Sequence, residues 1–489
     1  MKDNLKQKTF SGVVWISIHK FAIMFLGFVS GIVLARLLTP HDYGVVGMLT
    51  IFLAVARTFI DGGFGSALIQ KKQPTSEDYS TILYWNLALS VTLYGVLYAS
   101  APLIARFYDL ALLRDVLRVQ GIVLVINAVR IVQRNQLRKR LEFKKIAIIN
   151  VTANAIALVA TIYLAWKGWG VWALVAQQLL VSFITTSLYW LTAKWYPKLV
   201  FSGKSFKELF SFGGFILLSN LFNTLCNNIQ GLLIGKVYNS STLGYYSKAH
   251  TTESYSSTFI SNVLSQVSYP VMSEVQNDKT RMVSILKRFI GTSAYVTFPL
   301  LLLLMLLARP IFVLLYSDRW LPSVPYFQLL CFAGIATCLQ NINYFAVAAI
   351  GKSKAIFKWT IVKRVTGLVL TIAGLWAFGI YGMLIGGVLT SWMIYLVNAG
   401  LVSKYVGYTG MQQFKDLLPI ITAAFVAFLG AYLLGHFLPF SEGIAALLQF
   451  LTFVAIYLAI SIGFKMESYV STKEMSSTLL NRIWQTFRH

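Results

Sequence analysis

Acidic residues are scarce in this sequence, and so is charge of either sign. Among 489 residues, 17 are aspartate or glutamate and 42 are lysine or arginine, so charged residues make up 12%. Soluble domains carry about 25% charged residues, so the composition excludes an ordinary soluble protein. The shortage of acids leaves a formal net charge of +25. We do not expect nucleic acid as a partner, because the basic residues lie mostly in short stretches between apolar runs, where they set the orientation of membrane spans.

Cysteine is nearly absent as well. Cys226, Cys331 and Cys338 all lie in apolar runs, without the spacing of a metal site or a disulfide framework. Buried cysteines of this kind act as small hydrophobic side chains. The sequence also lacks a P-loop, a metal-ligand cluster and a nucleophile motif. We therefore expect no metal, no cofactor and no enzyme, and any active pumping would use an ion gradient, the membrane potential or consumption of the product.

What the sequence does contain is a succession of apolar runs, each near the roughly 20 residues that span a bilayer. They predict an all-α, polytopic membrane protein with about fourteen transmembrane helices. The span around residues 245–271 is rich in serine and threonine and is predicted only because an internal repeat aligns it with the second span. The predicted spans are about 10–36, 44–69, 80–104, 116–134, 146–166, 170–193, 208–235, 245–271, 283–308, 325–349, 355–377, 380–403, 417–437 and 444–464.

An internal repeat organises the chain. The stretch Gly31–Arg36 recurs as Gly231–Lys236, and Gly44 recurs as Gly244, both at an offset of about 200 residues. Six spans per copy return the chain to the same side of the membrane. We therefore expect two parallel six-helix repeats related by an axis along the membrane normal, followed by two extra C-terminal helices.

The expected organisation follows from the repeat and from the loop charges. Alternate loops rich in lysine and arginine should face the cytoplasm, which places both termini inside. Helical spacing of apolar residues in the tail predicts either an interfacial helix on the inner surface or a disordered segment. The predicted parts are an N-terminal six-helix lobe (1–193), a cytoplasmic linker (194–207), a C-terminal six-helix lobe (208–403), two additional helices (404–464) and a cytoplasmic tail (465–489).

Several charges fall inside the predicted spans, where each costs roughly 2.5–3.5 kcal/mol at the bilayer centre. Arg57 and Asp61 are four residues apart and share one helix face. They form either a self-neutralising pair that packs helices or a pair that lines a central cavity. His19 and Lys20 lie about ten residues into the first span, where Lys20 either extends toward the cytoplasm or faces the cavity.

The second half carries its own polar residues within spans. Lys363 and Arg364 are adjacent, so one of them could face the cavity and the other a neighbouring helix. Asn223 and Asn227 belong to an asparagine-rich stretch that indicates either hydrogen bonds between helices or a sugar-facing wall.

Two acids are candidates for ion coupling. They are Asp61 and Glu253, and we expect Glu253 to lie deeper than an interfacial Lys248. Across all the spans, basic residues outnumber acids. A cavity with this bias suits an anionic substrate such as a phosphate.

The segment Phe59–Lys72 (FIDGGFGSALIQKK) resembles the second-span signature of bacterial polysaccharide transporters, the O-antigen and exopolysaccharide flippase-like family. The stretches Ala101–Tyr108, Gln136–Phe143 and Ala35–Pro40 resemble further parts of the same pattern. The resemblance is close over the first half and topological over the rest.

The resemblance implies a member of the superfamily that also includes multidrug antiporters and the lipid II flippase. It implies two six-helix lobes around a cavity that opens alternately to each side of the bacterial inner membrane. The implied substrate is an oligosaccharide repeat unit on undecaprenyl pyrophosphate, moved to the outer leaflet, with membrane lipids and glycan polymerase machinery as further partners. The alternatives are an ion-coupled multidrug antiporter, a peptidoglycan lipid II flippase and a membrane glycan polymerase or ligase.

Overall fold

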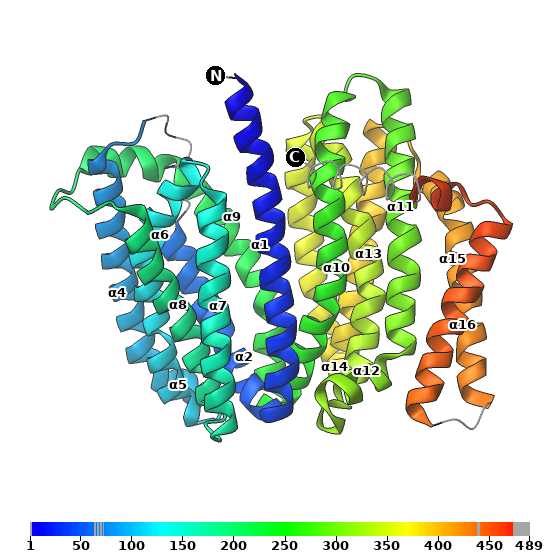
Figure 1. Cartoon of the computed structure of the whole chain (residues 1–489), viewed down its shortest axis with the longest axis horizontal. Coiled ribbons are helices and arrows are strands. Elements are labelled where there is room, and N and C mark those ends of the chain that lie inside the picture. The colour runs from blue at the N-terminus through cyan, green and yellow to red at the C-terminus, as the bar shows by residue number, and fades with distance from the viewer. Residues whose placement is uncertain are drawn as a thin grey trace. The chain divides into compact units, whose positions relative to one another are not determined.

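The computed structural model describes residues 2–62, 65, 68, 71, 73–437 and 441–472. Within these residues every regular element is a helix (Figure 1). The first nine labelled elements are α1 (Lys2–Leu37), α2 (Pro40–Asp61), α4 (Ser76–Phe107), α5 (Leu112–Gln120), α6 (Ile122–Lys139), α7 (Phe143–Trp166), α8 (Val171–Ala193), α9 (Gly203–Val237) and α10 (Ser240–Glu274). The others are α11 (Lys279–Leu306), α12 (Ala308–Tyr316), the short 3₁₀ helix η1 (Asp318–Trp320), α13 (Ser323–Ala349), α14 (Ser353–Tyr405), α15 (Gly410–Phe437) and α16 (Glu442–Gly463).

The all-α membrane fold predicted from the sequence is confirmed. Ten of the described helices are long and apolar enough to cross a bilayer. One of them, α14, contains a kink at Phe378 and Gly379, where Gly379 has a φ of 63°, so it joins the two spans predicted on either side of residue 378. Helices α6, α9 and α10 are not among these ten, which were identified from the described residues alone. The count of fourteen spans stays a prediction.

The fourth predicted span differs in detail, because it is divided into α5 and α6 at Gly121. A side chain at this position would come within 2.9 Å of the Tyr94 ring on α4. Glycine therefore allows the chain to bend where the two short helices pass α4 closely. The composition of residues 116–134 did not predict this division into two helices.

The chain forms two compact units, residues 1–247 and 248–489. Helix α9 groups with the first unit because it packs along α2. The boundary falls inside α10, so one continuous helix contributes residues to both units. The lobes predicted to divide at residues 194–207 stay a prediction.

One part of the internal repeat is visible within the first unit. Helix α1 ends at Leu37 and α2 begins at Pro40, while α9 ends at Val237 and α10 begins at Ser240, so the same helix boundaries recur after 200 residues. The remaining repeat layout stays a prediction.

The two turns of this repeat cross each other closely. A Cβ atom on Gly44 would overlap the backbone carbonyl of Ser240, and one on Gly244 would overlap the carbonyl of Pro40. The His41 Nδ1 atom also lies 2.6 Å from the Ser240 hydroxyl. Since Gly44 and Gly244 are equivalent in the repeat, the contact is reciprocal, and glycine at both positions lets the two backbones touch.

The predicted outer segment and tail are described in part. The residues after Ala308 form α12 and η1, and Trp320 is fully buried. The tail is helical over residues 467–472, while its predicted apolar positions lie outside the described residues: Leu479, Leu480, Ile483, Trp484 and Phe487.

Candidate functional site

Helix α2 presents a polar face near its C-terminal end. Leu53, Ala56 and Ile60 are buried against neighbouring helices, whereas Arg57 and Asp61 are exposed on the other face. The helix is fixed at its start by the Thr39 capping box with Asp42. Charged groups inside an apolar span persist when they face water, a ligand or an opposite charge. The exposed face of α2 is therefore the starting point of the candidate site.

Helix α6 adds three arginines to this face. Arg130, Arg134 and Arg138 are four residues apart, so they project from one side of the helix. The guanidinium groups of Arg134 and Arg130 act electrostatically on the Asp61 carboxylate, as does that of Arg57. In the described part of the chain no direct ion pair joins these groups. The Asp61 carboxylate therefore lies near several cations and forms a direct ion pair with none of these groups.

Helix α1 contributes His19 and Lys20 to the same region. The half-buried imidazole of His19 is within electrostatic range of Arg134 and of Lys20, whose side chain is exposed. We call Lys20, Arg57, Arg130, Arg134 and Arg138 the basic cluster. Three of these cations, Arg57, Arg130 and Arg134, act on the Asp61 carboxylate, while Lys20 lies near His19 and Arg138 near Arg134, so the net charge of the cluster is strongly positive.

Helix α9 adds amide groups beside α2. Thr58 and Thr224 are joined by a hydroxyl–hydroxyl hydrogen bond of 3.0 Å, which ties the two helices together. Asn223 donates from Nδ2 to the Ser219 carbonyl over 3.0 Å and is half-buried, while Asn227 is exposed. Hydrogen bonding within the helix therefore uses part of the asparagine stretch.

The arrangement in the first unit can bind an anion with many oxygen atoms. Guanidinium groups make charge-assisted, often bidentate hydrogen bonds to phosphate oxygens. Arginine also keeps its charge in every environment met in proteins. A diphosphate fits a surface in which cations outnumber acids in this way.

Lys363 and Arg364 lie in the second unit, apart from the basic cluster. Lys363 is buried and donates from Nζ to Asn398 Oδ1 over 2.7 Å, and Asn398 donates to the Gln340 carbonyl over 3.1 Å. Arg364 is half-buried. In this conformation Lys363 therefore serves a hydrogen-bond network that joins both halves of α14 to α13.

Lys248 is buried within the protein, and its position at the membrane interface stays a prediction. Its side chain is 4% exposed, and its Nζ lies 4.1 Å from the Tyr316 ring centroid and 5.5 Å from that of Trp320. Cation–π attraction to two aromatic faces offsets the loss of water around the ammonium group. Those rings come from α12 and η1, more than sixty residues further along, so local sequence could not show the contact.

Glu253 lies one to two turns after Lys248 on α10, in apolar surroundings. It is 7% exposed, and its Oε1 atom has no hydrogen-bond partner. The side chain packs against Gly334 of α13, near the thiols of Cys331 and Cys338, and Ser257 provides a hydrogen bond. The depth of this carboxyl group in the membrane stays a prediction.

Sequence reasoning missed Arg130, Arg134 and Arg138 as site residues. The signal available was their four-residue spacing, which places them on one face of a predicted span. That α6 packs beside α2 could not be predicted from the sequence. Within the described residues no group of histidine, cysteine, aspartate and glutamate could hold a metal ion.

Comparison with known proteins gives consistent results. A family model described as "Polysaccharide biosynthesis protein" matches residues 33–325. The teichuronic acid biosynthesis protein TuaB of Bacillus subtilis (strain 168) is 28% identical over 407 residues, which cover 80% of this chain and 84% of that relative. The succinoglycan biosynthesis transport protein ExoT of Rhizobium meliloti (strain 1021) is 24% identical, covering 87% and 85%, and the lipopolysaccharide biosynthesis protein WzxC of Escherichia coli (strain K12) is 22% identical, covering 89% and 86%.

Solved structures share the fold. The lipid II flippase MurJ in its inward closed conformation superposes with a TM-score of 0.75 at 16% identity, covering 93% of this chain and 99% of that chain. An inward-facing MATE family multidrug resistance transporter gives a TM-score of 0.62 at 16% identity, covering 81% and 98%. At these identities the likeness concerns the fold alone.

Proposed function

This chain belongs to the polysaccharide biosynthesis protein family, whose model matches more than half of it, and we propose that it moves a lipid-linked oligosaccharide across the membrane. The proposed substrate is a surface-polysaccharide repeat unit on undecaprenyl pyrophosphate. It would pass from the inner to the outer leaflet by alternating access. Relatives named for the biosynthesis or transport of teichuronic acid, succinoglycan and lipopolysaccharide support a glycan cargo.

The observation that carries the proposal is the basic cluster of the first unit. Arg57, Arg130 and Arg134 of α2 and α6 act on one carboxylate, and Lys20 and Arg138 add positive charge beside them, within a multi-pass membrane protein. A pyrophosphate carries several negative charges and cannot enter hydrocarbon without compensation. Arginine at the cluster would supply that compensation through charge-assisted hydrogen bonds. Asn223 and Asn227 would contact the sugar hydroxyls, and Lys363 and Arg364 would contribute in another conformation.

The proposed setting is the inner membrane of a bacterium, with both termini in the cytoplasm. Polyprenyl-linked sugars are assembled on the inner leaflet, so a basic surface should be reachable from that side. Glycan polymerase machinery is the partner expected to consume the product on the opposite side. Consumption there would itself drive net movement in the absence of any ion gradient.

A direct test uses the purified full-length protein in liposomes containing a fluorescent lipid-linked oligosaccharide. The fraction accessible to a membrane-impermeant quencher or glycosidase is measured from each side. We expect accessibility to equilibrate in minutes with the protein and to remain unchanged in protein-free vesicles. Movement of cationic drugs but not of the glycan lipid would favour a multidrug antiporter, and movement of lipid II alone would favour a peptidoglycan-precursor flippase.

Glu253 is the stronger of the two candidates for proton coupling. Asp61 lies among guanidinium groups that balance its charge, whereas the neighbours of Glu253 around Gly334 are neutral, and Lys248 faces Tyr316 and Trp320 instead. An uncompensated buried charge costs several kcal/mol. A carboxyl group in such surroundings can couple proton binding to a change in conformation.

Glu253→Gln should therefore remove the response of transport to an imposed proton gradient. Glutamine imitates the protonated side chain but cannot release a proton. We expect wild-type movement of the glycan lipid to change several-fold with the gradient and that of the variant to change by less than about twofold, since one coupled ion supplies energy of the order of 1–3 kcal/mol at common gradients. The rate is measured in the same liposomes with and without the gradient.

Glu274→Gln is the matched control, because Glu274 is an exposed acid at the end of the same helix. It should respond to the gradient as the wild type does. An unchanged response in the Glu253 variant would exclude this residue from coupling, and so would a wild-type rate that ignores the gradient.

A further inference from the structure

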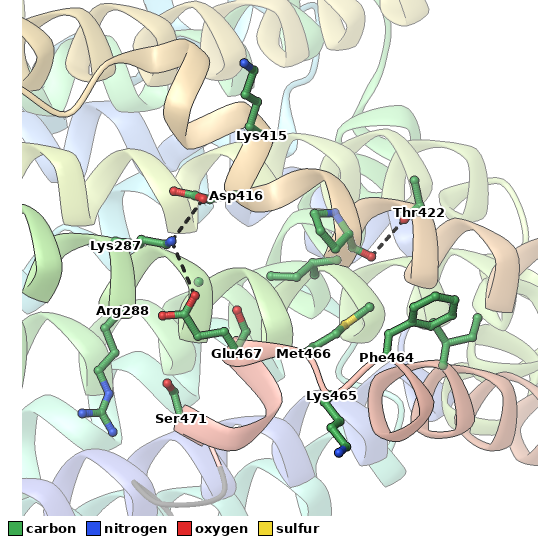
Figure 2. Close-up of a pocket in the computed structure, with 15 residues that line it drawn as sticks. Lys287, Arg288, Lys415, Asp416, Thr422, Phe464, Lys465, Met466, Glu467 and Ser471 are labelled. Atoms are coloured by element: carbon green, nitrogen blue, oxygen red, sulfur yellow. Dashed lines mark hydrogen bonds and ion pairs between the residues drawn. The ribbon is translucent and has the colours of Figure 1, made fainter.

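A polar cavity lies in the second unit and contains no residue of the basic cluster. It has a volume of about 520 Å³ and is formed by α11, α15, the end of α16 and the residues that follow α16 (Figure 2). The α15–α16 hairpin lies beside α11 (Figure 1). The proposed transport function leaves this cavity unused.

The cavity lies where apolar helices become polar. After Arg288, helix α11 continues as a mainly apolar run, and α15 does the same after Asp416. Helix α16 is apolar up to Gly463 and is followed by Phe464 and Lys465. Three candidate spans therefore change from apolar to charged at this level, which is the level of lipid headgroups.

Basic groups predominate around the cavity. Lys287 contacts two acids, with its Nζ at 3.3 Å from Asp416 Oδ1 and 3.4 Å from Glu467 Oε2. Three further basic residues line the cavity, so four bases face two acids: Lys287, Arg288, Lys415 and Lys465 against Asp416 and Glu467. In Figure 2, Arg288 and Ser471 lie on one side of the Lys287–Glu467 pair and Lys415 on the other. An anion can therefore be held between basic side chains and hydroxyl groups.

The floor of the cavity is apolar. Ile420 and Met466 are buried, and Pro419, Ile460 and Phe464 complete this part of the lining. A site for a free soluble anion would gain nothing from such a floor. The combination of a basic rim and an apolar floor matches a molecule with a charged head and hydrocarbon chains.

The segment at residues 467–472 forms one wall and is held against α11. A Cβ atom on Gly291 would come within 2.8 Å of the Ser468 hydroxyl, so glycine allows this close approach. The Tyr469 ring lies 6.1 Å from that of Tyr295. Glu467 itself is 80% exposed at its side chain, so an incoming anion could replace it beside Lys287.

We propose that this cavity binds the headgroup of an anionic phospholipid, with its phosphate at Lys287, Arg288 and Ser471. The glycerol and the upper acyl chains would cover Phe464 and Ile460. Basic pockets between transmembrane helices at the cytoplasmic surface are a known way to bind anionic lipid heads. The site is separate from transport, and it would fix α11 to the α15–α16 hairpin and to the following segment.

The test is native mass spectrometry of the full-length protein in detergent with added phosphatidylglycerol or phosphatidylcholine. We expect preferential binding of phosphatidylglycerol. The double variant Arg288→Gln, Lys465→Gln should bind it about fivefold or more weakly, since each basic residue near an anionic headgroup contributes about that factor. Lys465→Gln alone, on an exposed residue, provides a second and milder variant.

Lys404→Gln is the matched control, because Lys404 is exposed and basic but does not line the cavity. It should keep the wild-type preference. Equal binding of the two lipids, or full binding by the double variant, would overturn the proposal. Displacement of phosphatidylglycerol by inorganic phosphate at equal concentration would also overturn it, because it would identify a site for free phosphate.

Discussion

Arg57→Ala should reduce the movement of lipid-linked oligosaccharide by about 10- to 100-fold. A hydrogen bond to a charged group contributes about 1.5–3 kcal/mol, and every 1.4 kcal/mol is a factor of ten. Arg57 is exposed and borders the Asp61 carboxylate, so its removal also leaves that carboxylate facing the anionic cargo. The rate is measured in liposomes with the fluorescent substrate, and surface glycan is measured in cells that depend on this protein.

The controls for this prediction separate transport from folding. Arg57→Lys should retain part of the rate, because the charge remains while the bidentate geometry is lost. Arg106→Ala removes an exposed arginine at the end of α4, outside the basic cluster, and should behave as the wild type. Normal surface glycan in the Arg57→Ala variant, with the protein folded and inserted, would remove Arg57 from the mechanism.

Gly44→Ala should sharply reduce the amount of folded protein. The added methyl group would overlap the Ser240 carbonyl, and backbone atoms of α10 cannot turn aside as a flexible side chain can. Overpacking commonly costs about 1–3 kcal/mol, and sometimes more, which is a large share of the stability of a protein. Thermal unfolding in detergent, followed by size-exclusion chromatography, measures the loss.

Gly95→Ala is the matched control for this substitution. Gly95 also lies inside a long helix, but nothing stands within 4 Å of its added Cβ atom. This variant should be as stable as the wild type or slightly more so, because alanine favours helix more than glycine does. Gly244→Ala should resemble Gly44→Ala, since its methyl group would meet the Pro40 carbonyl. If the Gly44 and Gly95 variants unfold at the same temperature, the crossing contributes no special stability.

Much of the fold was predictable because it depends on periodicities within short windows. Apolar length located the helices, and the repeat located α10, which has the composition of a polar segment. The predicted spans 355–377 and 380–403 meet at the kink of α14 at Phe378 and Gly379. The break at Gly121 was not predictable, because it depends on the Tyr94 ring of another helix.

The candidate site was predictable in part for a related reason. Charged residues such as Arg57 and Asp61 cost free energy in a membrane span, so they are recognised from the sequence alone. Arg130 and Arg134 were not recognised as site residues, because they lie near the polar end of α6. Their role becomes apparent only from their proximity to Asp61 on α2. The burial of Lys248 was not predictable, because the rings of Tyr316 and Trp320 that contact it are distant in sequence. Sequence identifies unusual residues, whereas their partners depend on tertiary packing.

Helix α10 belongs to both compact units, since the boundary between them falls at Ser247 and Lys248. The helix is continuous through residues 247 and 248, so the two units cannot move independently of each other unless α10 bends or moves with them. Any conformational change during a transport cycle would therefore act on α10. The close contact at Gly244 would be the pivot of the helix, and Glu253 would move with it. The ion coupling proposed for Glu253 would then act on the same helix that joins the two units.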